Sequence, residues 1–188
     1  MTKFEELCQS FGYARNSWFE YRDKCQSFGA RVVSGFLKFL EIPDSAQMRA
    51  ASPEDVKTTR NLPENLCTWA KLDADGRPIP AGRFDAIRLE EDGFWHARFL
   101  LTVYEQPNVF PYQPLLLEFA FKPSGADFRV RLSQDESEIM VSEAKQDTFE
   151  ALNNALLSRI QNYFKDSTDW ERDSVPKPRK IGFTSGKQ

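Results

Sequence analysis

The sequence has little of the chemistry that most enzymes use, since it holds one histidine and three cysteines among 188 residues. Every histidine-dependent dyad, triad or metal site would therefore have to use His96. The chain also lacks the glycine-rich phosphate loops, the Gly-x-Ser-x-Gly elbow and the Cys-x-x-Cys pair that identify common nucleotide-binding, hydrolytic and redox sites. We therefore expect no metal ion and no cofactor, and the sequence favours an accessory role over a catalytic one.

Long apolar runs are also missing, because no stretch approaches 18 uninterrupted apolar residues. The N-terminus has acidic residues and glycine where a signal peptide would need an apolar run. The three cysteines, Cys8, Cys25 and Cys67, are odd in number, lack metal-like spacing and sit within apolar patterns. They predict buried free thiols of a reducing compartment, so we expect a soluble, cytoplasmic protein that does not contact a membrane.

The chain also has no large excess of charge of one sign, because its formal net charge is only −3. This value disfavours a general nucleic-acid or anionic-membrane binder, although a local basic patch would escape the average. Hydrophobic residues make up 40% and charged residues 28% of the chain, which are values of a globular protein. We expect one domain over residues 1–166 and a flexible basic tail over residues 167–188.

Helical spacing of apolar residues predicts N-terminal helices over residues 1–42. A short first helix is expected to stop at Gly12, and a longer second one to begin at Ser17, where Ser17-x-x-Glu20 fits a capping box. Gly29 and Gly35 lie inside the second helix and each costs about 1 kcal/mol relative to alanine. They indicate either close packing or a break in the helix.

Residues 43–83 form a proline-rich connection with few periodic apolar positions. Its start signals predict a short helix over residues 52–61. Residues 66–72 suit a strand, and the segment RPIPAG that ends the connection is interpreted as a loop.

Alternating apolar residues predict a sheet over residues 84–142, most clearly from Phe94 to Tyr104. Prolines at 107, 111 and 114 indicate a loop before the next strand, which carries its inward residues from Leu115 to Phe121. The short connections require antiparallel pairing, so we expect a meander-like sheet of four to six strands. A helix over residues 147–165 follows. The predicted fold is α+β, with the N-terminal and C-terminal helices packed on one face of the sheet.

The other face of this sheet, termed here the outer sheet face, is the first candidate site. By strand parity it gathers basic and aromatic side chains, namely Arg88, Arg98, Lys122, Arg129, Arg131, His96, Phe94 and Tyr104. Such a surface suits a nucleic acid or an acidic protein segment. The alternative is a solvated or partner-covered face on which Glu118 pairs with Arg98 or Arg129 across strands.

The second candidate is a magnesium site. Glu143-Ala144-Lys145 follows the apolar residues 139–141, and together with Asp85 it superficially resembles the signature of the PD-(D/E)XK nucleases. The resemblance implies that Asp85 and Glu143 hold Mg²⁺ while Lys145 supports the attacking water. Ser142 departs from the pattern, and the strand expected after the following helix is missing.

The interpretation that these observations favour is a non-catalytic accessory protein. It would bind a larger protein through the outer sheet face or the C-terminal tail, where Ile181-Gly182-Phe183 suits a docking peptide. A magnesium-dependent nuclease that uses Asp85, Glu143 and Lys145 is one alternative. A nucleic-acid-binding module that uses the arginines of the outer sheet face is the other.

Overall fold

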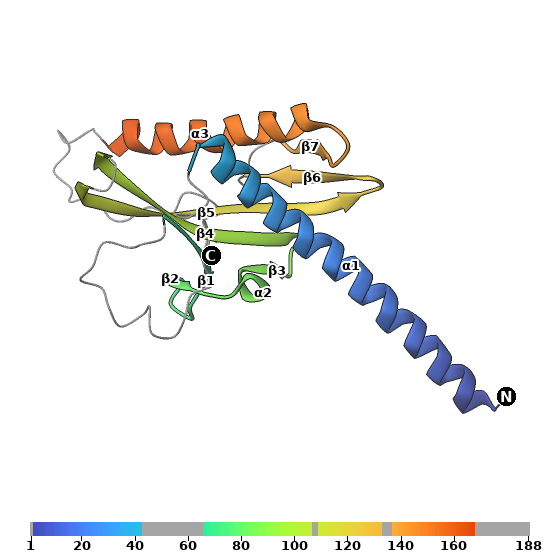
Figure 1. Cartoon of the computed structure of the whole chain (residues 1–188). Coiled ribbons are helices and arrows are strands. Elements are labelled where there is room, and N and C mark those ends of the chain that lie inside the picture. The colour runs from blue at the N-terminus through green and yellow to red at the C-terminus, as the bar shows by residue number, and fades with distance from the viewer. Residues whose placement is uncertain (1, 43–65, 107–108, 133–136, 168–188) are drawn as a thin grey trace.

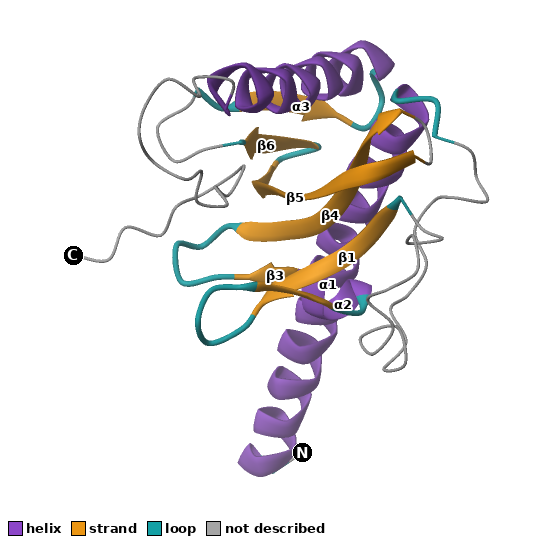
Figure 2. Cartoon of the chain, turned by 90° about the vertical axis from the view of Figure 1, so that its left-hand side faces the viewer, coloured by secondary structure: helices purple, strands orange, loops and turns teal. Residues whose placement is uncertain are grey.

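A computed structural model of the chain describes residues 2–42, 66–106, 109–132 and 137–167. It shows a twisted antiparallel sheet and one long helix from each end of the chain (Figures 1 and 2). The elements in chain order are α1 (Lys3–Phe39), β1 (Cys67–Leu72), β2 (Pro78–Pro80), α2 (Arg83–Ala86), β3 (Ile87–Leu89), β4 (Trp95–Gln106), β5 (Val109–Ser124), β6 (Asp127–Arg131), β7 (Ile139–Ser142) and α3 (Gln146–Ser167). The predicted α+β fold is confirmed.

The sheet has the strand order β2-β1-β4-β5-β6-β7, and β3 pairs with β4 beside β1. Its seven strands exceed the predicted range by one, because β2 forms within the segment that was interpreted as a loop. Pro78 and Pro80 are tolerated there since β2 lies at the edge of the sheet, where a missing N–H breaks no ladder on the outer side.

The predicted loop before Leu115 is also wrong, because β5 already begins at Val109 and contains Pro111 and Pro114. Within the described residues β6 pairs only with positions 120–124 of β5, so the first half of β5 is paired on the β4 side alone. One free edge makes prolines compatible with a strand.

The N-terminal region is one helix rather than two, since α1 runs without a break from Lys3 to Phe39. Gly12 does not end it, because this glycine keeps an ordinary helical backbone instead of the positive φ of a helix cap. The capping box lies at Thr2 and Glu5, not at Ser17: the Glu5 N–H donates to the Thr2 hydroxyl, and the Thr2 N–H donates to the Glu5 carboxylate.

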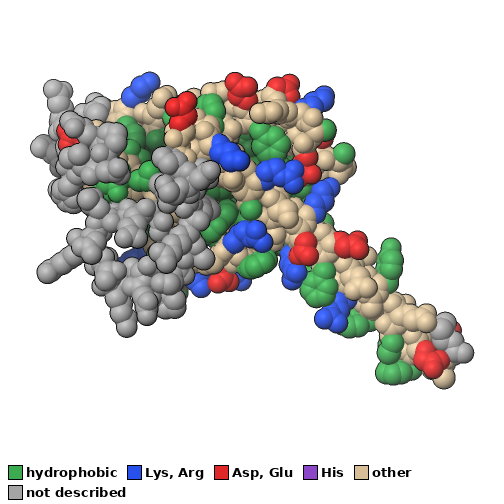
Figure 3. Space-filling view, viewed as in Figure 1, with side chains coloured by type: hydrophobic (Ala, Val, Ile, Leu, Met, Phe, Trp, Pro, Cys, Tyr) green, Lys and Arg blue, Asp and Glu red, His purple; other side chains and the backbone are tan. Residues whose placement is uncertain are grey.

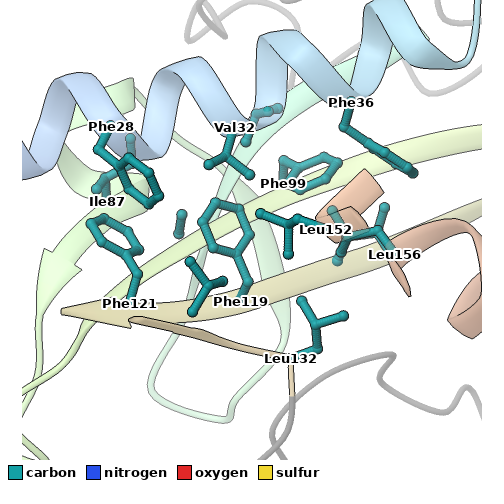
Figure 4. Close-up of a cluster of buried hydrophobic side chains, with 14 of the residues drawn as sticks. Phe28, Val32, Phe36, Ile87, Phe99, Phe119, Phe121, Leu132, Leu152 and Leu156 are labelled. Atoms are coloured by element: carbon teal, nitrogen blue, oxygen red, sulfur yellow. The ribbon is translucent and has the colours of Figure 1, made fainter. Parts of the chain in front are cut away.

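The core lies between the sheet and the two long helices (Figure 4). Phe28 of α1 stacks on Phe128 of β6 with ring centroids 3.7 Å apart, and α3 contributes Leu152 and Leu156 to the same core. Close packing accounts for a glycine at position 29 of the helix, because a Cβ there would lie 3.2 Å from side-chain atoms of Ile87 and Phe121. A glycine lets α1 approach β3 and β5 this closely.

The predicted helix over residues 52–61 and the tail lie outside the described residues. Among the described helices, none is both long and apolar enough to cross a membrane.

Candidate functional site

The outer sheet face takes its side chains from alternate positions of the central strands. β4 and β5 pair so that Arg98 lies opposite Glu118. The adjacent pair in the register, Phe99 and Leu117, points into the core. The strand parity read from the sequence therefore holds. β3 adds Arg88, which is exposed and paired in register with His96.

The centre of this face is closed to solvent, so the predicted solvated surface is wrong there, whereas the predicted cross-strand pair of Glu118 with Arg98 is present. Relative exposure is 4% for His96, 8% for Arg98 and 4% for Glu118. Such burial is costly for charged side chains unless each of them is paired and hydrogen-bonded.

The pairing is supplied by a compact group that we call the charged cluster. It joins three acidic and three basic side chains, namely Glu90, Asp92, Glu118, His96, Arg98 and Arg131. Glu118 Oε1 lies 2.8 Å from His96 Nδ1 and 2.6 Å from Arg98 Nη2. Asp92 and Glu90 come from the turn before β4, so a turn segment closes the cluster over the strand face.

Protonation of His96 completes the balance of charge. Its Nε2 lies 3.1 Å from an Asp92 oxygen, so both ring nitrogens face carboxylates and the doubly protonated form satisfies both. Burial lowers the pKa of His96, but the hydrogen bond to Glu118 and the charge of Glu90 outweigh it and leave the pKa above the ordinary value. Burial raises the pKa of Glu118, but the hydrogen bond from His96 and the positive charge of Arg98 outweigh it. The net pKa of Glu118 therefore lies below the ordinary value.

Aromatic side chains border the cluster on one side. The Arg131 guanidinium lies 3.7 Å above the Phe94 ring, and Lys122 Nζ lies 5.7 Å from the centre of the same ring. Arg129 pairs with Glu138 at 3.3 Å. Tyr104 lies further along β4 against Tyr112, with ring centroids 6.0 Å apart.

Three side chains of the cluster are spaced as the ligands of a metal ion would be, because one atom each of Glu90, His96 and Glu118 lies within 4.8 Å of the others. Arg98 already bridges the two glutamates, with Nη1 on Glu90 and Nη2 on Glu118. The guanidinium thus supplies the positive charge that a cation would bring. The arrangement acts as an internal ion-pair network that leaves few charges open for an anionic ligand.

The residues of the predicted magnesium site are not brought together. Asp85 lies on α2 beside β1 and pairs with Lys71 at 4.0 Å, whereas Glu143 follows β7 and pairs with Arg31 of α1 at 3.3 Å. Three strands, β4, β5 and β6, lie between β3 and β7 in the sheet, and adjacent strands are about 4.8 Å apart. The two carboxylates therefore have no common position for one ion.

A second surface was missed by the sequence analysis. The N-terminal part of α1 extends beyond the sheet (Figure 1), and its exposed side chains include large apolar ones (Figure 3). We call residues 3–21 the projecting part of α1. Relative exposure there is 72% for Phe4, 65% for Leu7, 67% for Phe11 and 45% for Trp18. The same apolar pattern was interpreted as a core face, and only the length of the helix relative to the sheet shows otherwise.

The projecting part joins the folded body at an aromatic group. Trp18 stacks on Trp95 with centroids 6.4 Å apart, and the indole N–H of Trp95 donates to the Tyr21 hydroxyl at 3.2 Å. This group links the projecting part of α1 to the start of β4. Cys8, which was predicted to be buried, is exposed because it lies beyond this point, whereas Cys25 and Cys67 are buried as predicted.

Comparison of this chain with protein-family models, with curated protein sequences and with solved structures gives no match.

Proposed function

We propose that this protein acts by binding another protein, and that the projecting part of α1 is its main contact surface. The observation that carries the proposal is the stripe of Phe4, Leu7, Phe11 and Trp18, whose side chains are 45–72% exposed among the residues that the structure describes. Exposed apolar patches of this kind typically serve protein or membrane contacts, and an amphipathic helix is a common way to present one. The folded body then serves as the base that holds the helix.

The proposal moves the contact from the outer sheet face to α1. The charged cluster on that face is largely satisfied by its own ion pairs, so it supports a structural role more than the binding of nucleic acid. The separation of Asp85 from Glu143 likewise supports an interaction protein over a magnesium-dependent nuclease. The free thiols of Cys25 and Cys67 support the cytoplasm as the compartment.

Site-specific photo-cross-linking in cells tests this proposal. A benzophenone amino acid in place of Phe11 should give a discrete protein adduct, and the adduct should disappear when Leu7→Glu is added. The matched control carries the same group in place of Asn16, which lies on the opposite side of the helix. Equal labelling at both positions, or no adduct at position 11, would overturn the proposal.

A further inference from the structure

We infer that the projecting part of α1 pairs with the same part of a second copy of this chain, in antiparallel orientation. This inference rests on the proposed function, because it names the protein that the helix contacts.

The first support is a heptad pattern that runs through α1 from Phe4 to Val32. Apolar residues recur at alternating spacings of three and four, namely Phe4, Leu7, Phe11, Ala14, Trp18, Tyr21, Cys25, Phe28 and Val32. A sustained 3.5-residue repeat is typical of a helix that packs along one seam against a partner. Cys25, Phe28 and Val32 use this seam to contact the sheet. The projecting part continues the same seam past the edge of the sheet, where the side chains of Phe4, Leu7 and Phe11 are exposed among the described residues.

The second support is that the exposed seam is complementary to itself. An antiparallel pair places Phe4 of one copy opposite Tyr21 of the other, and Leu7 opposite Trp18. The central layers then join Phe11 to Ala14, so a large ring meets a small side chain twice around the two-fold axis. Six seam positions per copy are used, and each helix ends where the folded body of its partner begins.

Orientation follows from where the sheet lies. In a parallel pair both folded bodies would meet at the same end, and at Cys25 the seam of each helix is already filled by its own sheet. An antiparallel pair puts the bodies at opposite ends. Charge agrees with this orientation, since residues 2–10 hold one lysine against two glutamates, whereas residues 15–24 hold three basic side chains against two acidic ones. Antiparallel pairing brings the acidic end of one helix beside the basic end of the other.

The exposed area sets the strength that we expect. A fully enclosed aromatic side chain buries about 150–250 Å². At their observed exposure Phe4, Phe11 and Trp18, with Leu7, offer roughly 450 Å² per copy, or about 900 Å² for the pair before flanking groups are added. Stable interfaces bury about 1,200–2,000 Å², so the area of these four side chains alone falls below that range. We therefore expect a dimer that dissociates on dilution.

Molar mass in solution tests the pairing. Sedimentation equilibrium of the wild type should show a monomer–dimer equilibrium that shifts toward the dimer with rising concentration. Leu7→Glu with Phe11→Glu should be monomeric throughout. The matched control is Gln9→Glu with Asn16→Glu, which adds the same charge away from the seam and should still dimerise. All four positions lie on the projecting part, so neither variant disturbs the core. A monomeric wild type, or a dimer that survives Leu7→Glu with Phe11→Glu, would overturn the inference.

Orientation is tested with spin labels, for which Cys8 is a native site because Cys25 and Cys67 are buried. From the helical rise and an interaxial distance of 8–10 Å, an antiparallel pair separates the two Cys8 backbones by about 17 Å. A label at Lys3→Cys in a Cys8→Ser background should report about 30 Å by the same geometry. A parallel pair would give about 10 Å at both sites, and that result would contradict the antiparallel arrangement.

The outcomes separate this inference from the proposed function. If the protein stays monomeric but the cross-linker at Phe11 captures a different protein, the self-pairing is wrong and the interaction surface stands. If the protein is monomeric and position 11 gives no specific adduct, both are wrong.

Discussion

Arg98 and Glu118 face each other across β4 and β5, and Arg98 Nη2 donates to Glu118 Oε1 at 2.6 Å on a nearly closed sheet face. The same carboxylate oxygen lies 2.8 Å from His96 Nδ1. The single buried carboxylate of Glu118 therefore neutralises the positive charges of both His96 and Arg98.

Removal of the negative charge of Glu118 should lower the stability of the folded state. We expect Glu118→Gln to lower the free energy of unfolding by about 3 kcal/mol, because the change leaves Arg98 buried without its full counter-charge. The double variant Glu118→Leu with Arg98→Met should recover at least half of the loss, since apolar replacement of both partners of a buried pair is often close to neutral. Chemical denaturation measures both. A double variant that is less stable than the single one would contradict this account of the pair.

Stability should also depend on the protonation of His96. Because the folded state holds the pKa of His96 above its ordinary value of 6.5, the folded state binds this proton more tightly than the unfolded state does. The stabilisation is complete below that ordinary value and is lost as pH rises through the raised pKa. The carboxylates act in the opposite sense, because the lowered pKa values of Asp92 and Glu118 remove stability only as the solution becomes strongly acidic.

Denaturation curves at a series of pH values around and above 6.5 check this expectation. The wild type should lose stability across this range, and His96→Gln should flatten the profile. The chain has no second histidine, so no other imidazole contributes to the slope. A slope that persists unchanged in His96→Gln would show that another group causes it.

Two glycines of α1 should respond to alanine with opposite signs. A Cβ at Gly29 would lie 3.2 Å from Ile87 and Phe121, which are both fully buried, whereas a Cβ at Gly35 meets nothing within 4 Å. We expect Gly35→Ala to stabilise the protein by up to about 1 kcal/mol through helix propensity. Gly29→Ala should destabilise it by about 1–2 kcal/mol, since overpacking exceeds that gain. Thermal unfolding of the two variants provides the comparison, and equal shifts would count against close packing at Gly29.

The three cysteines should differ in reactivity. Cys8 is exposed, whereas burial raises the pKa of Cys25 and of Cys67 to about 12. Since the thiolate is the reactive form, an aromatic disulfide reagent should modify one thiol quickly in the native protein and the other two only after unfolding. Cys8→Ser should abolish the fast phase. Rapid modification of more than one native thiol would show that the packing of α1 on the sheet does not bury Cys25 and Cys67 as described.

Much of the body could be predicted from sequence because strand parity is a local property. The alternation from Trp95 to Val103 separated core from outer face correctly, and β3, β4 and β6 lie close to their predicted positions. The prolines of β2 and β5 were wrongly interpreted as loop residues. A proline is compatible with a strand whose edge is free, and whether an edge is free depends on neighbouring strands far away in the sequence. Gly12 misled for a related reason: a glycine ends a helix only when its backbone takes a positive φ.

The sequence by itself determined the secondary-structure class, the two faces of the sheet and the apolar seam of α1, because each follows from residue spacing along the chain. Tertiary structure alone decided what these faces do. Cross-strand register and the turn that carries Asp92 made a basic stripe into a neutral charged cluster with a buried centre, since ion pairing depends on distances of a few ångströms. The extent of the sheet decided that the seam is core at Phe28 and exposed at Phe11, because a helix buries only the part that its own fold can cover.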